Sequence, residues 1–314
     1  MSVEQIQEEI IQLKKDNDVT ILAHYYQSID IQEIADFLGD SLGLSRIVDD
    51  QVTSKYVIFA GVLFMAETAS ILNQDKHILM PNKDAGCSLA DYLNPNLIQE
   101  FKEKYPKLPV VTYINSTAEV KAESDICCTS SNAAKIIKKI SQNFGVNKVL
   151  FGPDSNLADY AELKSNIQTI KIPENGHCSV HSQITSEDLV KARNKNPDAL
   201  ILVHPECTRN VRELADFVGS TAQMYKRVKK SRSNENQFII GTECGMLERM
   251  AKDFTNKEFF LLKEEITCFE MKKNSLSQIK HLLERLDDEK FEVKVPPKIA
   301  QKALKPINMM LAYS

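Results

Sequence analysis

The residues best suited to acid–base and anion-binding chemistry recur in this chain about every ninety positions. Each pair follows an apolar run: His24 and Tyr26, Tyr113 and Asn115, and His204 and Glu206. The step from His24 to Tyr113 is 89 positions, and the step from Tyr113 to His204 is 91. Imidazole, phenol and carboxyl groups can move protons and hydrogen-bond an anionic substrate. The spacing therefore predicts one site assembled from three equivalent segments.

A hydroxyl group recurs in the same register. Ser41 and Ser130 are 89 positions apart, and Thr221 follows Ser130 after 91. Each residue lies where a short apolar segment gives way to a predicted helix, so we expect all three to be N-caps. Helix N-termini offer free N–H groups and partial positive charge, which suit a carboxylate or a phosphate. An isolated Ser or Thr would be only a cap, but three in register indicate an anion-binding cavity.

Three cysteines complete the repeat. Cys87, Cys178 and Cys268 are spaced by 91 and 90 positions, and each follows the last predicted strand of its copy. Three thiolates with no fourth cysteine in register fit structural zinc poorly. They suit a 4Fe–4S cluster in which three irons bind cysteine and the fourth stays open as a Lewis acid. The alternative is three buried thiols without a metal.

The remaining Cys and His residues near these motifs are harder to assign. His181 lies three positions after Cys178, where the other copies have Ala90 and Met271. It either takes part in the chemistry or supports the cluster. We expect the other four cysteines to be small apolar residues near the core, unneeded by the site: Cys127, Cys128, Cys207 and Cys244.

The same register extends to the elements that must position these residues. Apolar runs ending at Gly61, Gly152 and Gly241 repeat at 91 and 89 positions, so the chain is an internal triplication. In the third copy the predicted strands are ALILV, DFVG, QFII and EFFLL, alternating with the helices VREL, TAQMYKRVKK and CGMLERMAKDF. Near-continuous apolar strands separated by helices favour parallel sheets covered on both faces.

The predicted fold class is therefore α/β, with three pseudo-threefold-related α/β/α sandwich domains whose parallel sheets form a triangle around a central active site. Ligands of such sheets bind beyond the carboxyl ends of the strands. The predicted units are residues 1–88 with 259–314, residues 89–173 and residues 174–258. We expect the C-terminal tail to return to the first unit and close the triangle.

Composition excludes several other classes of protein. The 314 residues carry a formal net charge of -4, which argues against nucleic-acid binding. No apolar run approaches the roughly 20 residues of a membrane span. The N-terminal segment SVEQIQEEIIQLKKDN predicts an acidic amphipathic helix rather than a signal peptide. We expect a cytoplasmic protein whose seven cysteines are thiols or ligands.

Ten short segments together resemble the quinolinate synthase family over nearly the whole chain: AHYYQ, GDSLGLS, AGCSLAD, YINSTAEVKA, TSSNA, HCSVH, HPEC, GST, GTE and CFEMKKN. The resemblance implies a triangular three-domain fold with one oxygen-sensitive 4Fe–4S cluster on Cys87, Cys178 and Cys268. It also implies a transferase of bacterial de novo NAD biosynthesis, which condenses iminosuccinate with dihydroxyacetone phosphate to quinolinate, phosphate and two waters. The pathway further implies an upstream aspartate-oxidising enzyme as a functional partner.

The resemblance also implies which side chains contact substrate: His24, Ser41, Tyr113, Asn115, Ser130, His204, Glu206 and Thr221, with Tyr26 as a further active-site tyrosine. Our hypothesis is that Glu206 and Tyr26 shuttle protons, while His204 and His24 orient carboxylate or carbonyl oxygens. These four are the candidate catalytic residues.

Two other functions remain open at this point. A hydro-lyase acting on a hydroxy acid would share the three-cysteine cluster but would need no phosphate site. An iron–sulfur sensor or cluster carrier would use the open iron for detection or transfer, but the charge distribution indicates no partner surface. Phosphate release from dihydroxyacetone phosphate would separate the first alternative, and cluster transfer to an acceptor would separate the second.

Overall fold

The computed structural model describes residues 2–314 and contains three four-stranded sheets whose strands all run parallel. The first sheet holds β1 (Val19–His24), β2 (Phe37–Gly39), β3 (Tyr56–Ala60) and β4 (His77–Leu79). The second holds β5 (Val110–Tyr113), β6 (Ile126–Cys128), β7 (Lys148–Gly152) and β8 (Gln168–Lys171). The third holds β9 (Leu200–Val203), β10 (Phe217–Val218), β11 (Gln237–Gly241) and β12 (Glu258–Leu261). Each sheet has the same order, with its second strand at one edge followed by the first, third and fourth.

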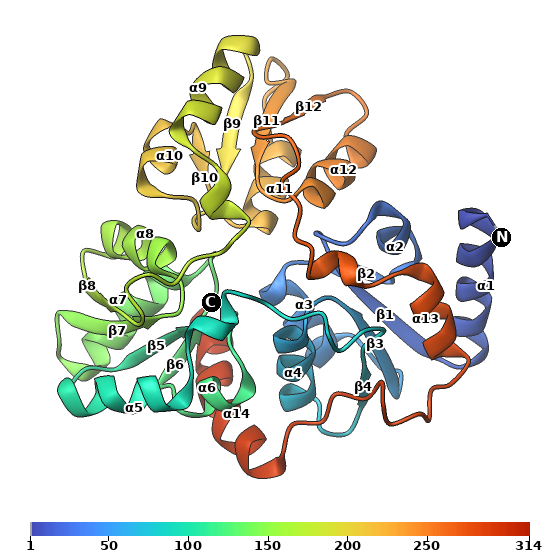
Figure 1. The fold of residues 1–314 in the computed structure, drawn as a ribbon, viewed down its shortest axis with the longest axis horizontal. Helices are drawn as coiled ribbons and strands as arrows, with labels where there is room; N and C mark the ends of the chain where they lie inside the picture. The colour runs from blue at the N-terminus through green and yellow to red at the C-terminus, as the bar shows by residue number, and fades with distance from the viewer. Residues whose placement is uncertain (1) are drawn as a thin grey trace.

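Helices occupy equivalent places in the three units. The first unit has α1 (Val3–Asp16), α2 (Ile29–Ile34), α3 (Ser41–Asp50) and α4 (Leu63–Leu72). The second has α5 (Pro95–Lys104), α6 (Ala118–Ala122), α7 (Ala133–Phe144) and α8 (Ser155–Ser165). The third has α9 (Ser186–Lys195), α10 (Arg209–Leu214), α11 (Thr221–Lys229) and α12 (Cys244–Asp253). The predicted α/β class is confirmed, as are the strands and helices predicted for the third copy. Figure 1 shows the three units around one centre.

One contact recurs in all three units and shows how the sequence repeat becomes a structural one. An aspartate just before the second strand accepts the backbone N–H of a residue in the first strand: Asp36 from Ile21 at 2.8 Å, Asp125 from Val110 at 2.7 Å and Asp216 from Ile201 at 2.8 Å. The backbone N–H of each aspartate donates to the carbonyl of the same strand residue. This reciprocal pairing fixes the edge strand against the central one in each unit.

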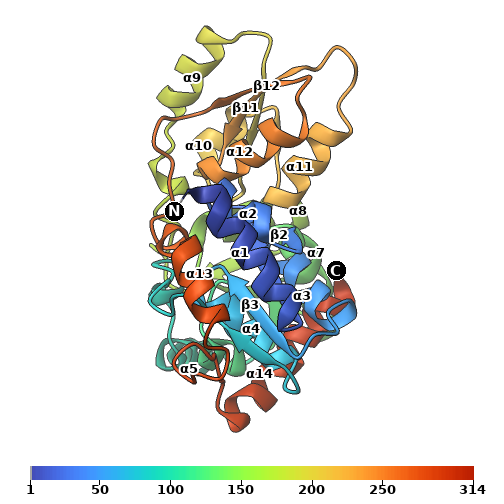
Figure 2. The ribbon, with the colours of Figure 1, turned by 90° about the vertical axis from the view of Figure 1, so that its right-hand side faces the viewer.

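The C-terminal segment returns to both other units. A short 3₁₀ turn (Met271–Lys273) leads to α13 (Leu276–Leu283), which lies beside α1 in Figure 2 and buries Ile279 and Leu282 with Ile10 of that helix. Equivalent 3₁₀ turns at Ala90–Tyr92 and His181–Gln183 follow the other two predicted cluster cysteines. Glu292 then forms an antiparallel bridge with Leu79 at the edge of the first sheet.

The last helix, α14 (Pro297–Tyr313), joins the first and second units. Its buried residues Ala303, Ile307 and Met310 share one apolar cluster with residues of α4, β6 and α7. The third unit has its own apolar clusters, between its sheet and its helices, which also receive Tyr25 and Tyr26 from the first unit.

Ion pairs supply much of the contact between the third unit and the other two. Arg249 of α12 lies 2.9 Å from Glu33 in the first unit. Arg212 of α10 lies 2.5 Å from Asp159 in the second unit, and Arg209 pairs with the same carboxylate. The units thus meet in two different ways, through a shared apolar core and through charged side chains.

The predicted division into residues 1–88 with 259–314, 89–173 and 174–258 stays a prediction, with one adjustment. Strand β12 pairs with β11, so residues 259–261 complete the third sheet and do not belong to the tail. In residues 2–314, no helix is both long enough and apolar enough to span a bilayer.

Helix α14 provides a test of how the first two units are held together. Ile307 is fully buried in the shared core, so Ile307→Ala should lower the free energy of unfolding by about 2–5 kcal/mol. Asn308→Ala, at an exposed position of the same helix, should change it by less than about 0.5 kcal/mol. Urea unfolding of both variants measures the difference. Equal losses would show that α14 contributes little to this core.

Candidate active site

The carboxyl ends of the three sheets meet at one cavity of about 330 Å³. The structure brings all twelve predicted site residues to its wall: His24, Tyr26, Ser41, Cys87, Tyr113, Asn115, Ser130, Cys178, His204, Glu206, Thr221 and Cys268. His24 and Tyr113 are the last residues of β1 and β5, and His204 directly follows β9. Because equivalent strands end at the same place in each unit, residues 89 and 91 positions apart become neighbours.

The residues that cap α3, α7 and α11 differ by one or two positions from the hydroxyl residues predicted to do so. Ser41 and Thr221 are the first residues of α3 and α11, and the caps are the preceding residues Asp40 and Ser220. Ser130 lies before Asn132, the cap of α7. The prediction that the three hydroxyls cap helices is therefore wrong. The cap oxygens bind the backbone, with Asp40 accepting from the Gly43 N–H at 2.9 Å, while the three hydroxyl residues line the cavity.

A chain of hydrogen bonds crosses the cavity wall and joins all three units. The Tyr113 hydroxyl donates to Glu206 Oε1 at 2.6 Å, and Glu206 Oε2 lies 2.7 Å from His181 Nδ1. His181 Nε2 lies 2.9 Å from the Thr242 hydroxyl, which is 2.5 Å from the Tyr26 hydroxyl. All five side chains end in groups that can donate or accept a proton.

Sequence reasoning predicted site roles for three members of this network. For His181 it left open a part in the chemistry or support of the cluster, and it did not single out Thr242. In the structure His181 contacts both a candidate catalytic residue and a predicted cluster ligand. Its Nδ1 lies 2.7 Å from Glu206 Oε2 and 3.3 Å from Cys178 Sγ. Thr242 gave no usable signal, since a threonine after an apolar run is common.

Burial sets the protonation states of the acid–base groups. Burial by itself would raise the pKa of Glu206, but His204, His181 and the Tyr113 hydroxyl outweigh it and lower that pKa to about 2. Burial raises the pKa of Tyr26 and of Tyr113 well above 10. At neutral pH Glu206 is therefore a carboxylate beside two neutral phenols.

The two strand-end histidines are neutral and share one tautomer. Burial lowers the pKa of His24 and of His204 to about 3. The Tyr26 backbone N–H donates to His24 Nδ1 at 3.1 Å, and the Glu206 N–H donates to His204 Nδ1 at 3.3 Å. A neutral imidazole that accepts at Nδ1 carries its proton on Nε2. Each ring can thus donate one hydrogen bond to a substrate oxygen.

The three repeat cysteines are free thiols that line the same cavity. Burial raises the pKa of Cys87 to about 12 and that of Cys268 to about 11, and it also raises the pKa of Cys178. The thiols are therefore protonated without a metal, and binding one would release protons. The other four cysteines do not line the cavity. Cys127, Cys128 and Cys207 lie in the apolar core as predicted, whereas Cys244 is half-buried, belongs to none of the apolar clusters and lies 3.6 Å from the Thr267 hydroxyl.

Ligand spacing distinguishes a single ion from a cluster. Among the described residues, the group of three whose ligand atoms all lie within 4.8 Å is Cys178, His181 and Glu206. The three repeat cysteines form no such group, so at least two of their sulfurs lie more than 4.8 Å apart, farther than zinc ligands at about 2.3 Å from one ion. In a multi-iron cluster each thiolate binds a different iron, so that separation does not argue against one.

The cavity contains no cationic side chain in the part of the chain that the structure describes. No Lys or Arg is among its lining residues, which include hydroxyls, amides, imidazoles, the acidic side chains of Asp40, Glu206 and Glu270, and the first residues of α3 and α11. An anionic ligand would therefore be held by neutral donors and by helix N-termini. Phe269, next to Cys268, also lines the cavity and is 80% exposed, so one side of the cavity opens to solvent.

Comparison with known proteins agrees with this geometry. The model of the family described as quinolinate synthetase A protein matches residues 8–312. The chain is 46% identical to quinolinate synthase of Thermotoga maritima over 303 residues, covering 96% of this chain and 98% of that protein. It is 45% identical to quinolinate synthase of Pyrococcus furiosus over 312 residues, covering 99% of both. With the enzyme of that name from Thermococcus kodakarensis the identity is 44% over 314 residues, covering 100% of both.

The hydrogen-bonded chain predicts the effect of one isosteric change. Thr242→Val keeps the shape of the side chain but leaves the buried His181 Nε2 and the Tyr26 hydroxyl without their shared partner. The free energy of unfolding of the metal-free protein should fall by about 1–3 kcal/mol. Thr242→Ser restores a hydroxyl and should recover most of that loss. Urea unfolding of both variants measures this loss. A Thr242→Val variant as stable as wild type would show that these hydrogen bonds do not stabilise the protein.

Proposed function

Because the chain belongs to the quinolinate synthase family, and is therefore an enzyme, we propose that it condenses iminosuccinate with dihydroxyacetone phosphate to quinolinate. The reaction releases one phosphate and two waters. One observation carries the proposal: three cysteines and nine polar side chains, drawn from three repeated units, line a single cavity. Family membership favours this reaction over a hydro-lyase or an iron–sulfur sensor.

We propose that Cys87, Cys178 and Cys268 hold a 4Fe–4S cluster. Their free state, their shared cavity and their spacing beyond that of single-ion ligands support this assignment. When bound, such a cluster supplies one iron without a protein ligand, which acts as a Lewis acid toward a substrate oxygen or nitrogen.

Substrate binding in this proposal uses neutral hydrogen-bond donors. Iminosuccinate brings two carboxylates and the triose brings a phosphate. The hydroxyls of Ser41, Ser130 and Thr221 and the free N–H groups at the start of α3 and α11 suit these anions. The Nε2–H groups of His24 and His204 suit carboxylate or carbonyl oxygens. Among the described lining residues there is also no lysine whose amine could form an imine with the triose ketone.

Proton transfer is assigned to Glu206 and Tyr26. With a pKa lowered to about 2, Glu206 is ionised and can accept a proton from a substrate carbon or nitrogen. With its pKa raised well above 10, Tyr26 stays protonated and can donate to a leaving hydroxyl. His181 and Thr242 connect these two side chains by hydrogen bonds and hold them in place relative to each other.

The buried cavity also suits an unstable substrate. Iminosuccinate hydrolyses in water, and most of the catalytic side chains here are nearly inaccessible to solvent, with His24 and His204 only 5% and 4% exposed. We therefore propose that an aspartate-oxidising enzyme supplies iminosuccinate to this chain as it is formed.

The cluster assignment can be tested with the three cysteines and a matched control. After anaerobic reconstitution with iron and sulfide, wild type should show a visible absorbance band and make quinolinate from dihydroxyacetone phosphate and fresh iminosuccinate. Cys87→Ala, Cys178→Ala and Cys268→Ala should each lose both properties. Cys127→Ala, which removes a buried thiol away from the cavity, should keep them. A cluster without quinolinate formation would favour the hydro-lyase, and no cluster would refute the metal site.

The role of Glu206 can be tested separately from the cluster. Glu206→Gln keeps the side-chain volume but removes the base, so turnover should fall by about 10²–10⁴-fold while the visible band is unchanged. Glu206→Asp retains a carboxylate and should recover part of the activity. Quinolinate formation and absorbance measured on the same anaerobic samples decide this, and near-normal turnover of the Gln variant would show the role to be wrongly assigned.

A further inference from the structure

Two buried acids outside the proposed catalytic set contact the backbone of the predicted cluster ligands. Asp154 is the N-cap of α8 and Glu243 is the N-cap of α12, and both are fully buried. They are 89 positions apart, so they occupy equivalent places in the second and third units. Their hydrogen bonds go to backbone N–H groups outside the network from Tyr113 to Tyr26, and the mechanism proposed above does not use them.

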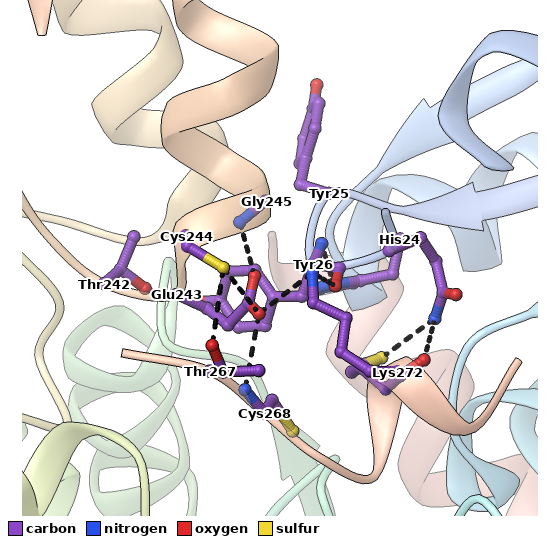
Figure 3. A network of polar contacts seen from close by, with 12 residues as sticks. His24, Tyr25, Tyr26, Thr242, Glu243, Cys244, Gly245, Thr267, Cys268 and Lys272 are labelled. Atoms are coloured by element: carbon purple, nitrogen blue, oxygen red, sulfur yellow. Dashed lines mark hydrogen bonds and ion pairs between the residues drawn. The ribbon is translucent and has the colours of Figure 1, made fainter. Parts of the chain in front are cut away.

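Each acid uses its two oxygens on different elements. Asp154 Oδ1 accepts the Leu157 N–H of α8 at 2.6 Å, and its Oδ2 accepts the Cys178 N–H at 3.1 Å. Glu243 Oε2 accepts the Gly245 N–H of α12 at 2.7 Å, and its Oε1 accepts the Cys268 N–H at 3.3 Å. Figure 3 shows Glu243 between Gly245 and Cys268. One carboxylate thus ties a helix start to a cysteine loop in each unit.

Helix capping alone does not explain a carboxylate at these places. A cap needs one acceptor oxygen, which serine or threonine supplies without charge. Burial raises the pKa of Asp154 and of Glu243, and burying such an acid costs several kcal/mol unless both of its oxygens are satisfied. In the first unit, α4 begins after Val62, which cannot cap, and no carboxylate is needed there for the helix to form. The contact of the second oxygen, with the cysteine amide in both units and also with Lys272 in the third, is what capping leaves unexplained.

In the first unit, the carboxylate that contacts the cysteine loop comes from the third cysteine loop and not from a helix N-cap. The Gly86 N–H, next to Cys87, donates to Glu270 Oε2 at 2.8 Å. Glu270 lies two residues after Cys268, so the third cysteine loop holds the first one. In every unit, a carboxylate accepts a backbone N–H from the segment that carries the cysteine.

The contact in the third unit extends to the opposite wall of the cavity. Lys272 Nζ lies 3.0 Å from Glu243 Oε1 and donates to the Tyr26 carbonyl oxygen at 2.8 Å. Figure 3 shows Lys272 between Glu243 and the segment that carries Tyr26. The loop of Cys268 and the backbone of Tyr26 are thereby held by one ion pair.

We propose that Asp154 and Glu243 are positioning residues that fix the backbones of Cys178 and Cys268 so that their sulfurs can bind the same cluster. The inference rests on the proposed 4Fe–4S site. A loop fixed before metal binding loses less conformational freedom when the cluster forms. Groups that orient metal ligands without touching the metal typically contribute 10- to 100-fold in metal retention.

Asp154→Asn and Glu243→Gln test the proposal because an amide has one acceptor oxygen where the carboxylate has two. Each variant can keep the helix contact or the cysteine contact, but not both. After anaerobic reconstitution, loss of the visible band on addition of an iron chelator should be about 10- to 100-fold faster than in wild type. This readout follows the cluster itself and requires no turnover.

Two matched controls separate positioning from general damage. Asp125→Asn and Asp216→Asn disturb a carboxylate-to-backbone contact of the same kind at the opposite end of the second and third sheets. They should retain iron as wild type does. Thermal unfolding of all four metal-free variants shows whether faster iron loss merely follows lower stability. If Asp154→Asn does not fold, Asp154→Ser keeps a capping oxygen and still removes the cysteine contact.

The outcomes are distinct. Faster iron loss in Asp154→Asn and Glu243→Gln, with the metal-free midpoints of all four variants alike, supports the proposal. Iron retention equal to that of the controls would overturn it, as would iron loss that simply tracks stability in all four variants. A wild-type protein that binds no cluster would refute the proposed metal site itself, and this inference with it.

Discussion

Parallel strand pairing is the constraint on which the rest of this structure depends. Strands that run parallel bring all their carboxyl ends to one edge of a sheet, and here three sheets of identical order direct those edges to one cavity. Three distant sequence segments can therefore contribute to one site. The reciprocal contacts of Asp36, Asp125 and Asp216 lie at the other end of the strands and keep the edge strand of each sheet in place.

Within the cavity, the carboxylate of Glu206 is stabilised by hydrogen bonds rather than by a cationic side chain. Glu206 stays ionised without an adjacent Lys or Arg in the described cavity wall, because hydroxyl and imidazole groups stabilise its carboxylate. The Tyr113 hydroxyl and His181 Nδ1 each contact one Glu206 oxygen, and the Thr242 hydroxyl links His181 Nε2 to Tyr26. A buried network in which each polar group has a partner holds its side chains in one arrangement.

The repeat made most of the fold and the cavity wall predictable, because a register of about ninety residues specifies which residues are equivalent. Strands, helices and the convergence of twelve residues follow from it. The remaining features depend on distances between units, which a one-dimensional pattern does not contain. Thr242 matters only because a tyrosine from another unit reaches it, and Asp154 matters because a cysteine loop passes its second oxygen. The caps differed from expectation because Asp40 and Ser220, one position earlier than Ser41 and Thr221, accept the first helical N–H groups.

The uneven way in which the units meet has a mechanical consequence. The first and second units share a continuous apolar core through α14, so separating them would expose hydrocarbon to water. The third unit meets them through ion pairs such as Arg249–Glu33 and Arg212–Asp159, and through Tyr25 and Tyr26, which pack into its apolar cluster. Separating the third unit would leave the nearly buried Arg212 without its carboxylate partner, which is costly. The border between the first two units therefore resists opening through hydrocarbon, and the borders of the third unit resist it through buried charge as well.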